Sequence, residues 1–174
     1  MVELIKQNYL ENKNKFEQTK AMLTKKLGNN VPINHVGSTA IPEIEVGKNI
    51  IDVLVGATNK AEFDKLFKLI EDLGFYPSTN SKSDIYQFFA SRQGETGNGD
   101  THIHLGIINT ERYDEFLTLK TYLLENKDEA INYSNHKKEL ITLGTTNRKE
   151  YRATKSKYVT NLIERAKQYK QQKN

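Results

Sequence analysis

Two short stretches dominate this 174-residue sequence: His35-Val36-Gly37-Ser38-Thr39-Ala40-Ile41-Pro42 and Ile50-Ile51-Asp52-Val53-Leu54-Val55. The first places a Gly-Ser pair at the end of a short apolar strand, where the backbone can turn tightly into a helix. A helix N-terminus presents unpaired N–H groups and a partial positive charge, which suit a phosphate. The second is an apolar strand with one carboxylate, Asp52, which can hold a cation such as Mg²⁺ beside that phosphate.

The composition is typical of one compact domain over residues 1–174. Hydrophobic residues make up 36% and charged residues 28% of the chain, and its net charge is +4. The absence of cysteine excludes a disulfide framework and a thiolate metal site. The first residues form a charged amphipathic pattern rather than a signal peptide, and no apolar run is long enough to span a membrane. We therefore expect a cytoplasmic protein without a membrane partner.

The pattern of apolar residues predicts an α/β (α+β) fold with a small mixed sheet of four or five strands and flanking helices. Strands are expected over 31–36, 48–55, 85–91 and 101–108, and helices over 4–27, 60–73, 111–125, 128–142 and 148–169. Ser38 is expected to cap a short helix that Pro42 ends. The loop 93–100 is expected to be a hairpin tip. The sheet core would occupy about 31–108, and the C-terminal helices, about 110–169, would form one wall of a cleft.

Two histidines, His102 and His104, alternate with apolar residues on one predicted strand. At this spacing both imidazoles project from the same face of the sheet. If that strand neighbours the strand of Asp52, the three side chains could bind a metal ion as two histidines and one carboxylate. The other interpretation is a structural pair that is hydrogen-bonded to the backbone or to Asp52. His35, just before the Gly-Ser turn, either enters the same cleft or caps the end of its strand.

These motifs resemble the nucleotidyltransferase superfamily, which has the DNA polymerase beta-like fold, and within it the GrpB family. The resemblance rests mainly on the block from His35 to Asp52 and on the His-x-His strand, and it extends to Lys48, Tyr151 and Lys155. It implies a nucleotidyltransferase-like core in which the Gly-Ser turn cradles phosphates and the Asp-His group is catalytic and holds metal. The residues implied for phosphate or nucleotide binding are Gly37, Ser38, Thr39, Lys48, Tyr151 and Lys155; those implied for catalysis and metal are Asp52, His102 and His104.

One departure from the superfamily pattern leaves two functional interpretations open. The position two beyond Asp52, where a second carboxylate is usual, is Leu54. We expect binding of a nucleotide or another phosphorylated small molecule, with Mg²⁺, Mn²⁺ or Zn²⁺ as the candidate ion and metal-dependent nucleotidyl transfer as the implied reaction. The alternative is a degenerate member of the superfamily that binds or regulates without enzymatic activity.

The basic charge is concentrated at the C-terminal end. Residues 148–174 contain nine Lys and Arg against two Glu, a net charge of +7, which leaves −3 for the rest of the chain. A basic helix can contact nucleic acid. A solvated helix face is the more frequent reason for such a charge run, and we favour it. The sequence leaves the oligomeric state open.

Overall fold

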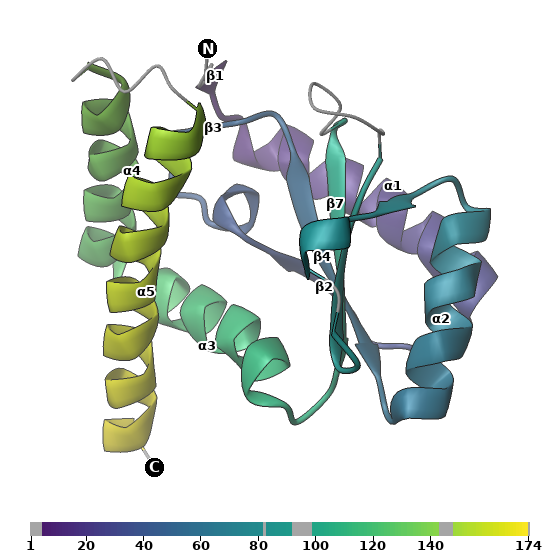
Figure 1. Ribbon diagram of the computed structural model, residues 1–174. Coiled ribbons are helices and arrows are strands. Elements are labelled where there is room, and N and C mark those ends of the chain that lie inside the picture. Colours follow the sequence, from purple (N-terminus) through teal and green to yellow (C-terminus); the bar gives the residue numbers. More distant parts are fainter. Residues whose placement is uncertain (1–4, 82, 92–98, 143–147, 174) are drawn as a thin grey trace.

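A five-stranded mixed sheet lies between two groups of helices in the computed structural model of the protein (Figure 1). The structure describes residues 5–81, 83–91, 99–142 and 148–173, without the side chains of 141–142 and 148–152. The strand order is β2-β4-β7-β6-β5, and β4 and β7 are parallel while the other neighbours are antiparallel. A separate two-stranded ribbon joins β1 to β3. This arrangement confirms the predicted α+β class with a small mixed sheet and a helical C-terminal segment.

The elements have the following bounds. The strands are β1 (Ile5–Lys6), β2 (Ile33–Val36), β3 (Val46–Gly47), β4 (Ile51–Ala57), β5 (Tyr76–Pro77), β6 (Tyr86–Ala90) and β7 (Thr101–Ile107). The α-helices are α1 (Tyr9–Leu27), α2 (Lys60–Asp72), α3 (Glu111–Glu125), α4 (Lys127–Thr142) and α5 (Arg148–Lys173). Two short 3₁₀ turns are η1 (Ser38–Ala40) and η2 (Thr79–Ser81). Most of the predicted hairpin tip, residues 92–98, lies outside the described residues.

The helices cover the two faces of the sheet unequally. On one face, α1 and α2 pack on alternate residues of β4 and β7, such as Val53 and Ile103, and form the main core. On the other face, Tyr113 of α3 packs against Val36 and Leu54, and α4 and α5 form a second core against α3. Figure 1 shows α1 and α2 on one side of the sheet and α3, α4 and α5 on the other. The side chain of Asp52 therefore lies on the face of the sheet that the C-terminal helices cover.

Two local predictions were wrong. The N-terminal helix begins at Tyr9 rather than near residue 4, because the Asn8 side chain caps it by accepting from the backbone N–H groups of Leu10 and Glu11. Ser38 is not a helix cap: Gly37 occupies the N-cap position of η1 and makes no side-chain cap bond. Because η1 is only three residues long, it lacks the aligned peptide dipoles that make a longer helix attract a phosphate.

None of the helices in the described part of the chain combines the length and the apolar character that crossing a bilayer requires.

Candidate functional site

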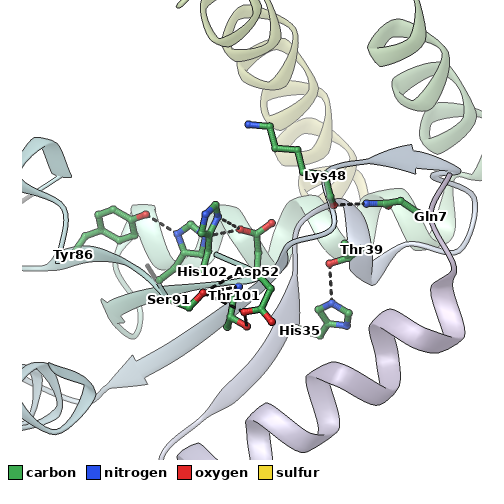
Figure 2. Close-up of polar contacts among 11 residues, drawn as sticks. Gln7, His35, Thr39, Lys48, Asp52, Tyr86, Ser91, Thr101 and His102 are labelled. Atoms are coloured by element: carbon green, nitrogen blue, oxygen red, sulfur yellow. Dashed lines mark hydrogen bonds and ion pairs between the residues drawn. The ribbon is translucent and has the colours of Figure 1, made fainter. Parts of the chain in front are cut away.

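The site is built where β4 and β7 run side by side. Their parallel register places Asp52 beside His102 and Leu54 beside His104. Asp52 Oδ1 lies 3.2 Å from His102 Nδ1 and 3.2 Å from His104 Nε2, so both imidazoles hydrogen-bond to one carboxylate oxygen. Figure 2 shows His102 beside Asp52, with Tyr86 at the far end of the group. The structure thus brings Asp52, His102 and His104 together, as the strand spacing predicted.

Hydrogen bonding decides the charge of Asp52. Burial on its own would raise the pKa of this carboxyl, but the bonds from His102 and His104 outweigh burial and hold the pKa well below its usual range. Asp52 is therefore a carboxylate at neutral pH and accepts both bonds. The Tyr86 hydroxyl lies 2.7 Å from His104 Nδ1. Since His104 Nε2 donates to Asp52, a neutral His104 accepts from Tyr86 at Nδ1, and the chain of donors runs from Tyr86 through His104 to Asp52.

Aromatic side chains hold the two histidines in place. Phe88 of β6 contacts both rings, with centroids 4.7 Å from His102 and 5.4 Å from His104. Phe116 of α3 lies 4.6 Å from His104 on the helix side. The guanidinium of Arg112 covers both Tyr86 and Phe116, at 4.9 and 5.0 Å from the ring centroids. Neither histidine can turn away from Asp52 without losing these contacts.

The Gly-Ser turn presses directly against Asp52. Gly37 has a φ of 72°, and a Cβ atom at this position would lie 3.0 Å from both Cβ and Cγ of Asp52 and closer still to Oδ2. Glycine is therefore required both by backbone conformation and by the space that the carboxylate occupies. The next residue, Ser38, borders two adjoining cavities that Asp52 also borders.

His35 does not belong to this group, although the sequence placed it near the turn. Val36 pairs with Asp52 across β2 and β4, so the side chain of His35, one residue earlier, projects from the opposite face of the sheet. There His35 stacks on Phe16 of α1 with ring centroids 4.7 Å apart, and its Nε2 lies 2.9 Å from Thr39 Oγ1 (Figure 2). Both His35 and Thr39 are buried, and they hold the turn from behind.

The burial of His35 makes a prediction about acid stability. Burial, with a smaller effect of Lys120, lowers the pKa of His35 to about 4 from 6.5. Between these values the unfolded chain binds a proton that the folded protein excludes, so the free energy of unfolding falls as pH falls from 6.5 to 4, by at most about 1.4 kcal/mol per pH unit. His35→Gln should flatten this part of the profile in urea unfolding at successive pH values. Parallel profiles for the two proteins would contradict the assignment.

Three lysines line a small cavity beside Asp52. The cavity has a volume of about 110 Å³ and is bordered by Lys48, Lys137 and Lys155, with Ser38, Gly47, Ile50, Asp52 and His102 completing the lining. Lys48 precedes β4, Lys137 lies on α4 and Lys155 on α5. The cavity therefore collects three positive side chains from distant parts of the sequence around one carboxylate.

Lys137 is the residue that sequence reasoning missed. Its side chain is 2% exposed, and Nζ donates to the carbonyl of Val46 at 3.1 Å and lies 4.7 Å from the ring centroid of Tyr133. Burial, with a further contribution from the charge of Lys155, lowers the pKa of Lys137 to about 7, against a smaller opposing effect of Asp52. Nothing in the sequence marks this lysine as buried.

Lys48 is positioned by the N-terminal ribbon. Strand β1 pairs with β3, the backbone N–H of Gln7 donates to the carbonyl of Glu45 at 2.7 Å, and Gln7 Nε2 donates to the carbonyl of Lys48 at 3.1 Å. Figure 2 shows the last of these bonds. The ribbon also carries Val46, which accepts from Lys137. Of the remaining predicted residues, Tyr151 lies on α5, but its side chain is outside the described part of the structure.

A second, mainly apolar cavity of about 210 Å³ adjoins the lysine cavity. It shares Ser38, Asp52 and Lys155 with the lysine cavity and also borders Gly37 and His104. The rest of its wall is Ile41, Phe116, Leu119, Lys120, Leu123, Tyr133 and Val159. A larger cavity of about 400 Å³ lies elsewhere, between α3 and α5, and contains none of the predicted site residues. We locate the candidate site at Asp52 because the convergent polar groups lie there.

Comparison with known proteins identifies the family. The family model described as GrpB protein matches residues 3–165, almost the whole chain. The chain belongs to the GrpB family. The crystal structure of the conserved protein GrpB from Enterococcus faecalis superposes with a TM-score of 0.77 at 24% identity, covering 96% of this chain and 99% of that one. This likeness confirms the fold.

Two further comparisons cover less of the chain. The UPF0157 protein PA4798 of Pseudomonas aeruginosa is 29% identical over 134 residues, which is 77% of this chain and 54% of that protein. The chain thus spans about half the length of this curated relative. A structure of the Cid1 poly(U) polymerase with MgGTP bound gives a TM-score of 0.48 at 14% identity, covering 75% of this chain and 42% of that one. A likeness at this level carries no conclusion about function.

The GrpB site does not provide the donors of a two-ion magnesium centre. Leu54, at the place of the second carboxylate, is fully buried against Val36 and Tyr113. Both histidines turn a nitrogen to Asp52 itself, and within the described residues no group of three or more His, Asp or Glu side chains is arranged to hold a metal ion. One carboxylate with two imidazoles suits Zn²⁺ or Mn²⁺ better than Mg²⁺. A metal ion at these residues stays a prediction.

Three basic residues of the C-terminal helix of this GrpB protein form ion pairs with neighbouring helices. Lys167 forms ion pairs with Glu111 and Glu115, Arg165 with Glu129, and Lys173 with Glu125. These pairs tie α5 to α3 and α4. They support the interpretation of the charge run as a packed, solvated helix face rather than as a nucleic-acid interface.

Proposed function

We propose that this protein binds a nucleotide or another phosphorylated small molecule in the cleft around Asp52. The lysine cavity would take the phosphate, and the adjoining apolar cavity would take part of the organic group. The observation that carries the proposal is the convergence of one buried lysine, Lys137, and two partly buried lysines, Lys48 and Lys155, on a small cavity. Three lysine side chains that converge on one small cavity provide the positive charge and the hydrogen-bond donors that a phosphate requires.

Each group in the lining has a distinct task in this proposal. The lysine ammonium groups supply charge-assisted hydrogen bonds to phosphate oxygens, the strong class of hydrogen bond. Ser38 adds a hydroxyl donor at the junction of the two cavities. Asp52 keeps His102 and His104 oriented, and Gly37 allows the turn to approach. Phosphate binding here depends on side chains, because η1 is too short to act as a helix terminus.

Binding without nucleotidyl transfer is the form of the function that we favour. Transfer through two metal ions needs carboxylates on both sides of the ions, and Leu54 removes one of them from the strand. Leu54 is also part of the core between β4 and α3, so its position is occupied by packing. Cytoplasmic localisation and any dependence on a divalent ion stay predictions.

Thermal-shift measurements test the proposal directly. AMP, ADP, ATP, coenzyme A and inorganic phosphate would be added to the wild-type protein with EDTA, and again with Mg²⁺, Mn²⁺ or Zn²⁺. A ligand at 100 times its Kd should stabilise the folded protein by about 2.7 kcal/mol. If Zn²⁺ or Mn²⁺ stabilises the wild-type protein and His102→Ala removes this effect, the site also binds a metal ion at Asp52.

A matched pair of variants locates the bound ligand. Lys155→Met should weaken binding roughly 10- to 100-fold, as expected for a lost hydrogen bond from a charged group. Lys157→Met, two residues along α5 at an exposed position, should bind as the wild type does. No stabilisation of the wild type by any of these compounds, or equal binding by Lys155→Met and wild type, would overturn the proposal.

A further inference from the structure

The relative sizes and the walls of the two cavities indicate which class of ligand the site binds. This inference rests on the function proposed above. We infer that the ligand is a phosphate monoester of a largely apolar ring, with a single phosphate between the lysines and the ring in the adjoining cavity. A nucleoside triphosphate, the substrate class that the superfamily resemblance implies, fits this site less well.

The lysine cavity is the smaller of the two and collects the positive charge. Its volume is about 110 Å³, against about 210 Å³ for the apolar cavity. Lys48, Lys137 and Lys155 all border this one cavity, so their charge is concentrated on a single group.

The adjoining cavity is unfavourable for a second and third phosphate. Its wall is mainly apolar, formed by Ile41, Phe116, Leu119, Leu123, Tyr133 and Val159. Asp52 borders both cavities and is negatively charged, because its hydrogen bonds to the histidines keep its pKa low. A phosphate chain that extended from one cavity into the other would pass this carboxylate and then face aliphatic and aromatic side chains. A ring buries apolar surface there instead.

A lysine in the wall of the apolar cavity indicates which polar group the ring carries. Lys120 of α3 contributes to the wall, and burial, with a smaller effect of Lys20, lowers its pKa. Lysine donates hydrogen bonds and accepts none when it is charged. The ring is therefore expected to carry an acceptor, such as a carbonyl oxygen or a ring nitrogen, toward Lys120. Ser38, Asp52 and Lys155 line both cavities. The phosphate in one cavity and the ring in the other would therefore be separated by little more than one side chain.

Titration calorimetry in EDTA with four probes tests this inference: inorganic phosphate, phenyl phosphate, AMP and ATP. We expect phenyl phosphate and AMP to bind at least tenfold more tightly than inorganic phosphate, and AMP at least tenfold more tightly than ATP. If ATP binds more tightly than AMP, and Lys155→Met weakens both, the ligand class is wrong while the proposed phosphate site stands. If none of the four probes binds, the proposed function itself fails.

Substitutions in the apolar cavity separate ring recognition from phosphate recognition. Val159→Phe should fill part of this cavity and weaken AMP and phenyl phosphate at least tenfold, while inorganic phosphate binds as before. Thr160→Phe, at the next and exposed position of α5, is the matched control and should change neither. Lys120→Met gives a second variant, which should weaken AMP but not inorganic phosphate. Equal weakening of the esters and of inorganic phosphate by both cavity variants would overturn the inference.

Discussion

Replacing Gly37 with alanine should lower the free energy of unfolding by about 2–6 kcal/mol and abolish ligand binding. The alanine has to adopt a φ of 72° with a ψ of −171°, a region that is essentially restricted to glycine and costs other residues about 1–3 kcal/mol. Its Cβ also meets the Asp52 side chain, and such overpacking costs roughly 1–3 kcal/mol. Either the turn or the carboxylate has to move, and both movements displace the groups that border the two cavities.

The matched control for this variant is Gly28→Ala. Gly28 has a φ of 109° and a ψ of 155°, and a Cβ atom there would meet nothing within 4 Å, so this substitution isolates the backbone strain. Thermal unfolding should show a Tm lower by roughly 5–25 °C for Gly37→Ala, at about 2–4 °C per kcal/mol for a chain of this size. Gly28→Ala should show a smaller drop and unchanged ligand binding. The same loss of stability in both variants would mean that Gly37 does not contact Asp52 as described.

Lys137→Met should weaken phosphate binding by a factor of about 100 while leaving the fold as stable as before, or more stable. Methionine is similar to lysine in length and apolar, so it can occupy the buried site without the cost of removing a charge from water. The lowered pKa of Lys137, about 7 against 10.5, measures that cost. Between pH 10.5 and 7 the unfolded chain binds a proton that the folded protein resists, so wild-type stability falls as pH falls through this window. Lys137→Met should not show that decrease.

Binding should have the opposite dependence on pH. A phosphate favours the charged form of Lys137, so wild-type affinity should fall above pH 7 by up to tenfold per pH unit, whereas phosphomonoesters are already doubly charged in that range. The charged and titratable groups that act on Lys137 are Lys155 and Asp52, with the ring of Tyr133 in contact. Calorimetry from pH 6 to 9 on wild type, Lys137→Met and the exposed control Lys138→Met tests this. A wild-type affinity that does not change with pH would show that Lys137 does not contact the bound anion.

Regular elements were predictable because their packing leaves a periodic pattern in the sequence. The helix over 111–125 has the predicted bounds, and β6 and β7 lie within one residue of theirs. The ribbon of β1 and β3 was missed, since two-residue strands are too short to show any alternation. Its formation depends on pairing between residues about forty positions apart, which a local pattern cannot reveal.

The candidate site was predictable only in part, for a related reason. The convergence of Asp52, His102 and His104 followed from their places on neighbouring strands, and the face of His35 could have been inferred from the alternation along β2. The lysine cavity could not be inferred. Lys137 is buried because α4 packs on β3 through Lys137 itself and through Ser134, whose hydroxyl accepts from the backbone N–H of Glu45. That contact joins residues about ninety positions apart.

The origin of the three lysines has a consequence for cooperativity. Lys48 belongs to the segment that leads into the sheet, whereas Lys137 and Lys155 belong to helices that lie on the other side of α3 from the sheet core. An anion held by all three lysines adds an electrostatic link between this segment and the helices, which already share the core that contains Ile41 and Ile44. Without it, mutual repulsion of the ammonium groups opposes the docking of the helices. The ligand would thus act as an electrostatic crosslink, and the helical layer would open and exchange its amide protons least when the site is filled.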